Sequence, residues 1–472
     1  MTALDEARAR VRDAAGDELV ERLEHLDRSR ASRPRDDRPP PAPDARAAVD
    51  CDVALVGSGL STLYAVTLAA RGLKVAVFDR ARAAVAHREW NASGPELRRL
   101  VRAGITDDAG LEEMIVSRYD HGVCRWHGGG TYPVRDVLDH AIDASTLLTR
   151  ARERARPWAC ASTTARRWWA TAARGGRVAL RFQGAEGVLD LVARAMVDAR
   201  GASSPSATAD LVCPTVGGVL TGLEEGDAPE QMNPRVGDIL VTTEHVEEGR
   251  QHIWEGFPGR AGETTVYLFF YDRAERVGDG ALMRLYARFF ARLGRYKRGD
   301  ARLERATFGM IPGWSRLTPA PRSPSPRVVL VGDAAARQSP LTYCGFGATL
   351  RSLDPASDAI VRVVEGADGR DAAVDDAAVH AATGALAHMI ASPPRDPAAL
   401  NRLLDAAFGT LHEMGQEPFA ALLRDEMSAR DIVRFLSQTS VKVPAVYPEV
   451  FRVLGARGVG RWGAGIARGL LG

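Results

Sequence analysis

The 472-residue sequence has few lysines and no excess of charge of one sign. Lys+Arg total 62 and Asp+Glu total 60, for a formal net charge of +2, and lysine stands only at positions 74, 297 and 442. This balance argues against nucleic-acid binding, which needs a basic face or segment. No uncharged apolar run approaches the ~20 residues of a membrane span, and no apolar run near the N-terminus resembles a signal peptide. We therefore expect a cytoplasmic protein.

Cysteine is also scarce. The five cysteines stand at positions 51, 124, 160, 213 and 344 and form no C-x-x-C pair. This pattern suggests neither a zinc site nor a disulfide framework, and it fits a reducing compartment. We expect no metal site.

The chain is long enough, and at 45% hydrophobic and 26% charged residues apolar enough, to bury the cores of two or three structural units. Its patterns divide it into four parts. Residues 1–49 read as a helical extension and a Pro-rich linker, and 205–320 as a β-sheet domain. Residues 50–204 and 321–370 read as two halves of one α/β domain, and 371–472 as a helical region. Residues 151–178 show neither helical nor strand periodicity, so a degenerate segment and a poorly patterned surface hairpin both remain open.

Residues 51–80 have the pattern of a strand, a glycine turn, a helix and a second strand. The first strand, Val53 to Val56, ends at Gly57-Ser58-Gly59, and the second ends at Asp79. In such a βαβ unit the first glycine makes the turn, and the second lets a pyrophosphate approach the helix N-terminus. An acid about 20 residues later accepts hydrogen bonds from a ribose. We therefore predict a dinucleotide site of Rossmann type, whose candidate residues are Gly57, Gly59, Leu60, Ser61, Thr62, Asp79 and Arg80.

A second glycine turn lies far downstream and indicates which dinucleotide is bound. Gly332-Asp333 follows the strand-like run Val328 to Val331, and Gly345-Phe346-Gly347 begins a long helical pattern. A carboxylate near the pyrophosphate and ribityl chain, together with a helix N-terminus at the flavin ring, is what FAD requires and NAD does not. The candidate residues of this element are Gly332, Asp333, Pro340, Gly345, Phe346 and Gly347. Arg135, expected to begin a helix, is either a further cofactor contact or a solvent-facing side chain.

Several motifs resemble the CruA/CruP-type lycopene cyclase family. They are Arg88 to Ser93 followed by Glu96-Leu97, Trp254 to Pro258 followed by Thr264 to Phe269, Phe308-Gly309, and Gly332 to Gly347. The resemblance covers roughly residues 50–150 and 190–440. It implies a three-layer FAD-binding Rossmann-type domain, a β-sheet substrate domain and a helical C-terminal region.

The resemblance also implies an activity on a linear carotenoid. Its end group would be protonated and closed into a ring with no net redox change, which requires a buried acid in an apolar channel. Glu255, Asp272 and Glu89 are the candidate acids. One alternative is an FAD- and NAD(P)H-dependent reductase or monooxygenase of an isoprenoid or another lipophilic substrate. Another is a flavin-binding paralogue without catalysis.

A lipophilic substrate would bring the protein to a membrane surface. In the last helical segment apolar residues such as Phe451 and Trp462 alternate with arginines such as Arg457 and Arg468. This pattern fits a helix on the inner face of the cell membrane, and it fits a helix packed on the protein body equally well. The sequence gives no indication of an oligomeric state.

Overall fold

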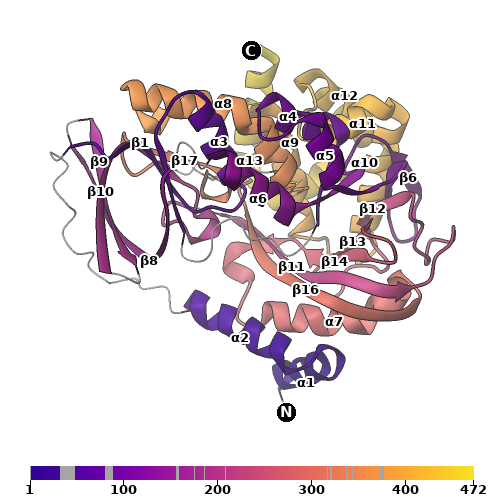
Figure 1. The fold of residues 1–472 in the computed structure, drawn as a ribbon. Coiled ribbons are helices and arrows are strands. Elements are labelled where there is room, and N and C mark those ends of the chain that lie inside the picture. The colour runs from indigo at the N-terminus through magenta and orange to yellow at the C-terminus, as the bar shows by residue number, and fades with distance from the viewer. Residues whose placement is uncertain are drawn as a thin grey trace.

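The structure is a computed structural model (Figure 1). It describes residues 2–31, 48–79, 89–155, 159–174, 176–184, 187–207, 209–315, 317–318, 322–335, 339–342, 344–371 and 377–471. Arg80 lies outside these ranges.

The first layered unit is built on a largely parallel sheet. Its strand order is β1-β2-β8-β9-β10-β17, and β1 also pairs with β10. β1 pairs in parallel with both β2 and β10. On the outer sides, β2 pairs in parallel with β8, and β10 pairs in parallel with β17. The strands are β1 (Cys51–Val56), β2 (Val75–Asp79), β8 (Ala159–Arg174), β9 (Arg177–Gly184), β10 (Gly187–Asp198) and β17 (Val328–Leu330).

Alternating side chains of β1 enter two different cores, which makes the unit three-layered. Val53 and Leu55 pack against helices on one face, in a core shared with α3 (Thr62–Ala70), α6 (Ala144–Ala155) and α8 (Gly345–Glu365). Ala54 and Val56 face the opposite core, where Phe78 stacks on Phe182 with ring centroids 4.1 Å apart. The predicted α/β fold class is confirmed.

The third layer is an antiparallel ribbon. β8 and β10 extend beyond the parallel sheet, and β9 pairs antiparallel with both extensions. Residues 159–174, from the segment without clear periodicity, are therefore paired along their length, first with β2 and then with β9. Of the two interpretations left open by the sequence, the backbone pairing favours the hairpin.

The second unit is an eight-stranded sheet of order β15-β11-β14-β13-β12-β5-β6, with β16 paired to β11. β5 and β6 come from within residues 50–204, so strand pairing crosses the bounds expected for the two domains. Those bounds stay a prediction. The strands are β5 (His121–Arg125), β6 (Thr131–Val134), β11 (Leu211–Leu223), β12 (Val236–Val241), β13 (His252–Pro258), β14 (Thr264–Phe270), β15 (Asp272–Arg273) and β16 (Gly299–Gly313).

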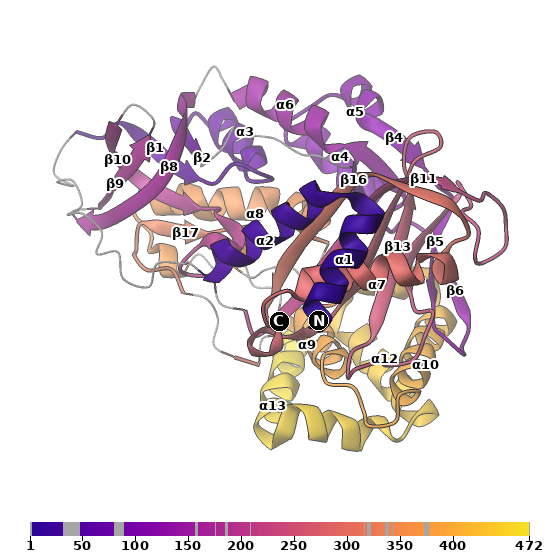
Figure 2. The same cartoon turned by 90° about the horizontal axis from the view of Figure 1, so that it is seen from below.

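Helices cover both faces of this second sheet. On one face α7 (Ala281–Tyr296) packs with the N-terminal helices α1 (Ala3–Ala15) and α2 (Asp17–Ala31), whose Val11 and Leu23 are fully buried. On the other face the C-terminal helices share a core with the strands. They are α9 (Ala377–Ile390), α10 (Ala399–Met414), α11 (Gln416–Leu423), α12 (Ala429–Lys442) and α13 (Val446–Leu471). Figure 2 shows them gathered at one side of the molecule.

A small sheet and two helices pack into the core on the helical face of the first unit. The small sheet has the order β3-β7-β4. These elements are β3 (Glu89–Ala92), α4 (Gly94–Arg102), α5 (Asp108–Met114), β4 (Ile115–Arg118) and β7 (His140–Asp143). Within the described ranges, no helix combines the length and the apolar character that a membrane crossing needs.

Candidate cofactor and substrate site

The turn after β1 depends on one glycine. Gly57 has a φ of 101°, and a Cβ placed on it would lie 2.3 Å from the carbonyl oxygen of Ala199. Its N–H donates to the carbonyl of Phe78 at 2.7 Å. Both the backbone conformation and the close approach therefore require glycine at this position.

The helix that follows this turn presents its N-terminus to a cavity. Gly59, Leu60 and Ser61 line that cavity, and no side chain caps α3. The backbone N–H groups at the start of a helix have no acceptor within the helix. This end of α3 can therefore bind an anion. A Cβ on Gly59 would have open space around it. Thr62 has another role, because its hydroxyl donates back to the carbonyl of Ser58 at 2.5 Å.

The downstream glycine turn faces the same cavity. Gly332 has a φ of 56°, and both Gly332 and Asp333 line the cavity. The Asp333 carboxylate has no hydrogen-bond or ion-pair partner among the described residues, and burial raises its pKa to about 6. A Cβ on Gly201 would lie 3.5 Å from Asp333 Oδ2, so the turn after β10 reaches the same point.

The N-terminus of α8 completes this wall. Gly345 and Phe346 line the cavity, and the residue before them, Cys344, provides no side-chain cap. The Thr342 hydroxyl also lies at the wall, buried and without a partner in the described part of the chain. Gly347 instead packs outside the cavity, where a Cβ would lie 2.5 Å from Glu96 Oε1.

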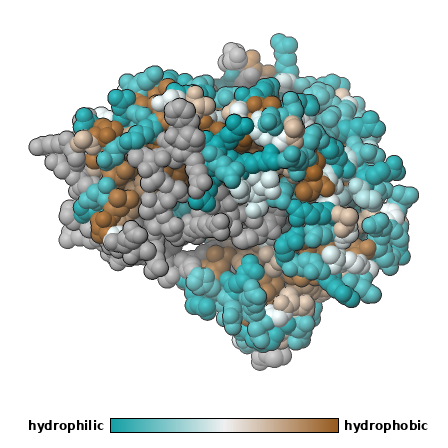
Figure 3. All heavy atoms as spheres, viewed as in Figure 1, coloured by the Kyte–Doolittle hydropathy of each residue, from teal (hydrophilic) through white to brown (hydrophobic). Residues whose placement is uncertain are grey.

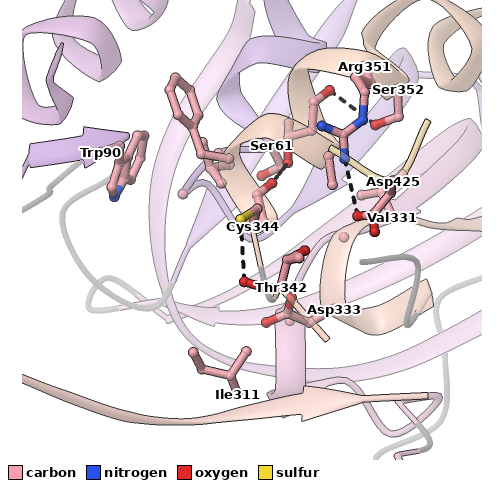
Figure 4. Close-up of a pocket in the computed structure, with 18 of the residues that line it drawn as sticks. Ser61, Trp90, Ile311, Val331, Asp333, Thr342, Cys344, Arg351, Ser352 and Asp425 are labelled. Atoms are coloured by element: carbon pink, nitrogen blue, oxygen red, sulfur yellow. Dashed lines mark hydrogen bonds and ion pairs between the residues drawn. The ribbon is translucent and has the colours of Figure 1, made fainter. Parts of the chain in front are cut away.

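The cavity has a volume of about 680 Å³ and joins the two layered units (Figure 4). Part of the cavity wall is formed by the glycine turns and the N-termini of α3 and α8. Another part, which we call the apolar end, is formed largely by apolar side chains of the second sheet and its neighbours. These are Leu138, Cys213, Phe257, Tyr267, Phe269 and Ile311, with Trp90.

Glu255, on β13, is a carboxylate of the apolar end. Two thiols lie near it at the wall, Cys213 and Cys344. Burial raises the pKa of both thiols, and the charge of Glu255 adds to the increase. The thiols therefore stay protonated near neutral pH, which leaves Glu255 as the group with acid-base capacity beside them.

Glu89 also lines the cavity, at the start of β3. It is 5% exposed and accepts a hydrogen bond from the Thr265 hydroxyl at 3.5 Å. Its carboxylate lies 3.8 Å from the Arg305 guanidinium. These contacts tie Glu89 to the second sheet.

The third candidate acid, Asp272, is fully buried in a double ion pair. Its carboxylate lies 3.0 Å from Arg250 and 3.3 Å from Arg276. It is not among the described residues that line the cavity. The geometry favours a structural role, in which the ion pairs join β15 to neighbouring segments.

The remaining candidates lie beside the cavity or away from it. Asp79 accepts hydrogen bonds from the N–H of Ser58, at 2.7 Å, and from its hydroxyl. Pro340 is buried close to the wall but is not a lining residue.

The helix expected at Arg135 does not form, because a bend follows β6 there. Arg135 is exposed; its backbone N–H donates to Gln416 Oε1, and its carbonyl accepts from Gln416 Nε2.

Sequence reasoning missed a charged cluster at the cavity wall. Arg351, one turn and a half into α8, pairs with Glu96 of α4 and lies 3.4 Å from Asp425, in the segment between α11 and α12 (Figure 4). Arg351 and Asp425 both line the cavity. The residues of this charged cluster come from three distant segments of the chain, so no local sequence pattern could have identified the cluster.

Several proteins of known structure share this fold. A geranylgeranyl bacteriochlorophyll reductase-like protein from Thermoplasma acidophilum has a TM-score of 0.57 and 14% identity, with 86% of this chain and 99% of that chain covered. p-Nitrophenol 4-monooxygenase PnpA from Pseudomonas putida DLL-E4 has a TM-score of 0.54 and 18% identity, covering 79% and 98%. Halogenase PltM in complex with phloroglucinol and FAD has a TM-score of 0.56 and 13% identity, covering 88% and 96%. No protein-family description and no curated protein matches the sequence.

Proposed function

We propose that this chain binds FAD and is an oxidoreductase of a lipophilic substrate. The observation that carries the proposal is the Asp333 carboxylate, which faces the cavity without a partner among the described residues. Leaving such a half-buried carboxylate without a donor costs free energy unless a ligand supplies one. The ribityl and ribose hydroxyls of FAD are donors of the required kind.

The other groups at this end of the cavity fit the same ligand. The uncapped N-terminus of α3, at Gly59 to Ser61, would hold the pyrophosphate. Asp79, at the end of β2, would accept a hydrogen bond from the adenosine ribose. The uncapped N-terminus of α8, at Gly345, would stabilise negative charge on the flavin ring. FAD, when bound, supplies hydride-transfer chemistry.

The apolar end of the cavity defines the proposed substrate. Its wall of Phe257, Phe269 and Ile311 offers few hydrogen-bonding groups, so it would favour a hydrocarbon chain over a polar metabolite. An isoprenoid or carotenoid end group has this character. The geranylgeranyl bacteriochlorophyll reductase-like protein from Thermoplasma acidophilum, which shares the fold, agrees with that class.

If the protein is a reductase, its reaction is the saturation of one carbon–carbon double bond of the substrate. NAD(P)H and one proton are consumed, NAD(P)⁺ is released, and the substrate gains two hydrogens. Glu255 is positioned at the apolar wall to give the proton to the substrate carbon.

The same placement of Glu255 favours a second candidate, ring closure of a lycopene-like polyene. There the proton from Glu255 would start cyclisation, and loss of a proton would end it without net redox change. Glu89, also at the wall, would be a second carboxylate near the developing cation.

One experiment separates the two reactions. The purified flavin-loaded protein is incubated with lycopene or a geranylgeranyl substrate in detergent, and NADPH oxidation is measured against product formed. One NADPH consumed per product, with a product mass two units higher, supports the oxidoreductase. A product of unchanged mass formed without NADPH consumption supports cyclisation. No product from either substrate contradicts both.

A further inference from the structure

Two C-terminal helices, α12 and α13, carry most of the exposed large apolar side chains in the described part of the chain. Seven large hydrophobic residues are exposed in the described part of the chain, and five of them lie on these two helices. The other two, Val188 and Leu189, lie on β10, where Figure 3 shows apolar atoms at the left. We define the C-terminal surface by the five residues Val433, Val441, Tyr447, Phe451 and Leu470.

The first segment of α13 carries two exposed aromatic side chains. Tyr447 and Phe451 are one turn apart and are 57% and 56% exposed. Between them Val450 is half-buried, and farther along Ile466 enters the core shared with α9 to α12. α13 is kinked at Gly455, which has a φ of 64°, so Tyr447 and Phe451 lie on the segment before the kink and Ile466 on the segment after it. The second segment is packed through Ile466, and the two aromatic rings of the first segment are exposed. Figure 2 shows α13 along one edge of the molecule.

Charge is distributed unevenly between this surface and the rest of the chain. Residues 429–471 contain seven basic and two acidic side chains, although the whole chain has a net charge of only +2. The remainder of the chain is therefore net negative. Both acids are already engaged: Glu449 pairs with Arg452 at 2.6 Å, and Asp431 takes part in the cap of α12.

Several of these cations are available to a partner. Arg430, Arg434 and Arg457 are exposed and form no ion pair with any residue that the structure describes. Arg434 is next to Val433 in α12, and Arg457 lies six residues after Phe451, just past the kink at Gly455. The surface thus combines unpaired cations with exposed apolar groups.

We propose that the C-terminal surface docks on an anionic phospholipid bilayer. Tyr447 and Phe451 would enter the interface between headgroups and acyl chains, and Arg434 and Arg457 would contact lipid phosphates. Stable attachment of a peripheral protein needs an apolar and an electrostatic contribution together, and this surface supplies both. The inference does not depend on the proposed function, because it rests on exposure and charge outside the cavity.

Charge complementarity selects the lipid surface over a second copy of the chain. A symmetric dimer through α12 and α13 would bring two net-positive surfaces together, and the repulsion would oppose association. An anionic bilayer carries a negative charge, so it attracts the net-positive C-terminal surface.

Flotation of the full chain with vesicles tests the proposal. Vesicles of phosphatidylglycerol and phosphatidylcholine are compared with vesicles of phosphatidylcholine alone, at low and high salt. We expect binding to the anionic vesicles that weakens with salt. Arg434→Gln with Arg457→Gln should lower partitioning roughly 25-fold, about fivefold for each charge, and Phe451→Asp should lower it at least tenfold. Val188→Asp is the matched control, because Val188 is also 56% exposed but lies on β10.

Three results would overturn the proposal. The first is no binding of the wild-type protein to anionic vesicles. The second is an equal loss of binding in Val188→Asp and Phe451→Asp. The third is a wild-type dimer, measured by light scattering without vesicles, that Phe451→Asp converts to a monomer while lipid binding is unchanged. Thermal unfolding of each variant shows whether it is folded.

Discussion

Asp79, the last residue of β2, accepts a 2.7 Å hydrogen bond from the backbone N–H of Ser58, in the turn after β1. This contact joins the acid at the end of the second strand to the glycine turn at the end of the first. The carboxyl ends of β1 and β2 are thereby held together at one edge of the sheet, beside the N-terminus of α3. The two glycines of the turn differ in what surrounds them, and that difference can be tested.

Gly57→Ala and Gly59→Ala should separate folding from cofactor binding. At Gly57 an added Cβ meets the Ala199 carbonyl at 2.3 Å in a backbone of positive φ, so we expect a loss of about 3 kcal/mol of unfolding free energy. At Gly59 nothing lies within 4 Å, so the fold should be retained while the methyl group obstructs the cofactor. Urea unfolding and flavin titration measure the two effects. Equal stability of both variants would contradict the geometry.

Asp333→Asn should make the apo protein more stable at neutral pH. Burial raises the pKa of Asp333 to about 6 in the folded chain, above its usual 3.8. The folded state therefore binds the proton more tightly, and the wild-type protein loses stability as pH rises from about 4 to above 6. The pKa difference between the folded and unfolded states corresponds to a loss of ~3 kcal/mol of unfolding free energy over this pH range. Denaturant unfolding of the flavin-free forms from pH 4 to 7.5 measures it, and a constant difference between the two proteins would refute the shift.

Glu255→Gln should abolish turnover while flavin binding is retained. The amide fills the same space at the wall of the cavity but cannot release a proton to the substrate. We expect at least a hundredfold lower kcat with an unchanged flavin spectrum. Glu275→Gln, at an exposed position of the same domain, is the matched control. Normal turnover in Glu255→Gln would remove this residue from the mechanism.

Asp272→Asn should reduce stability without reaching the cavity directly. The change leaves Arg250 and Arg276 without their buried carboxylate. We expect a loss of about 2 kcal/mol, less than for a fully buried pair because both guanidinium groups reach solvent. Thermal unfolding measures the loss. A variant of unchanged stability but no turnover would return Asp272 to the list of candidate acids.

The sequence predicted those elements around the cavity that depend on local pattern. The βαβ unit, the strand before Gly332 and the helix beginning at Gly345 all form where periodicity and glycine turns placed them. Asp333 and Gly59, 274 positions apart, line one cavity as expected. Parallel strands end at one edge of a sheet, so two such turns can be placed together without coordinates.

Contacts between distant segments could not be predicted in this way. β5 and β6 join the second sheet through β12, which lies over 100 residues later. The ion pairs of Arg351 with Glu96 and Asp425 depend on how α4 and the C-terminal helices pack. Arg135 has no helix because Asp136 adopts a φ of 58° in the bend. In each case tertiary packing decides the result, and no local periodicity records it.

The flavin content of the purified chain tests the central claim most directly. The protein is reconstituted with FAD, freed of excess ligand and denatured, and the released flavin is identified by chromatography. The account predicts about one FAD per chain in the wild-type protein and a strongly reduced amount in Gly59→Ala and Asp333→Ala. A folded wild-type protein that retains no FAD, or variants that retain as much as the wild type, would contradict it.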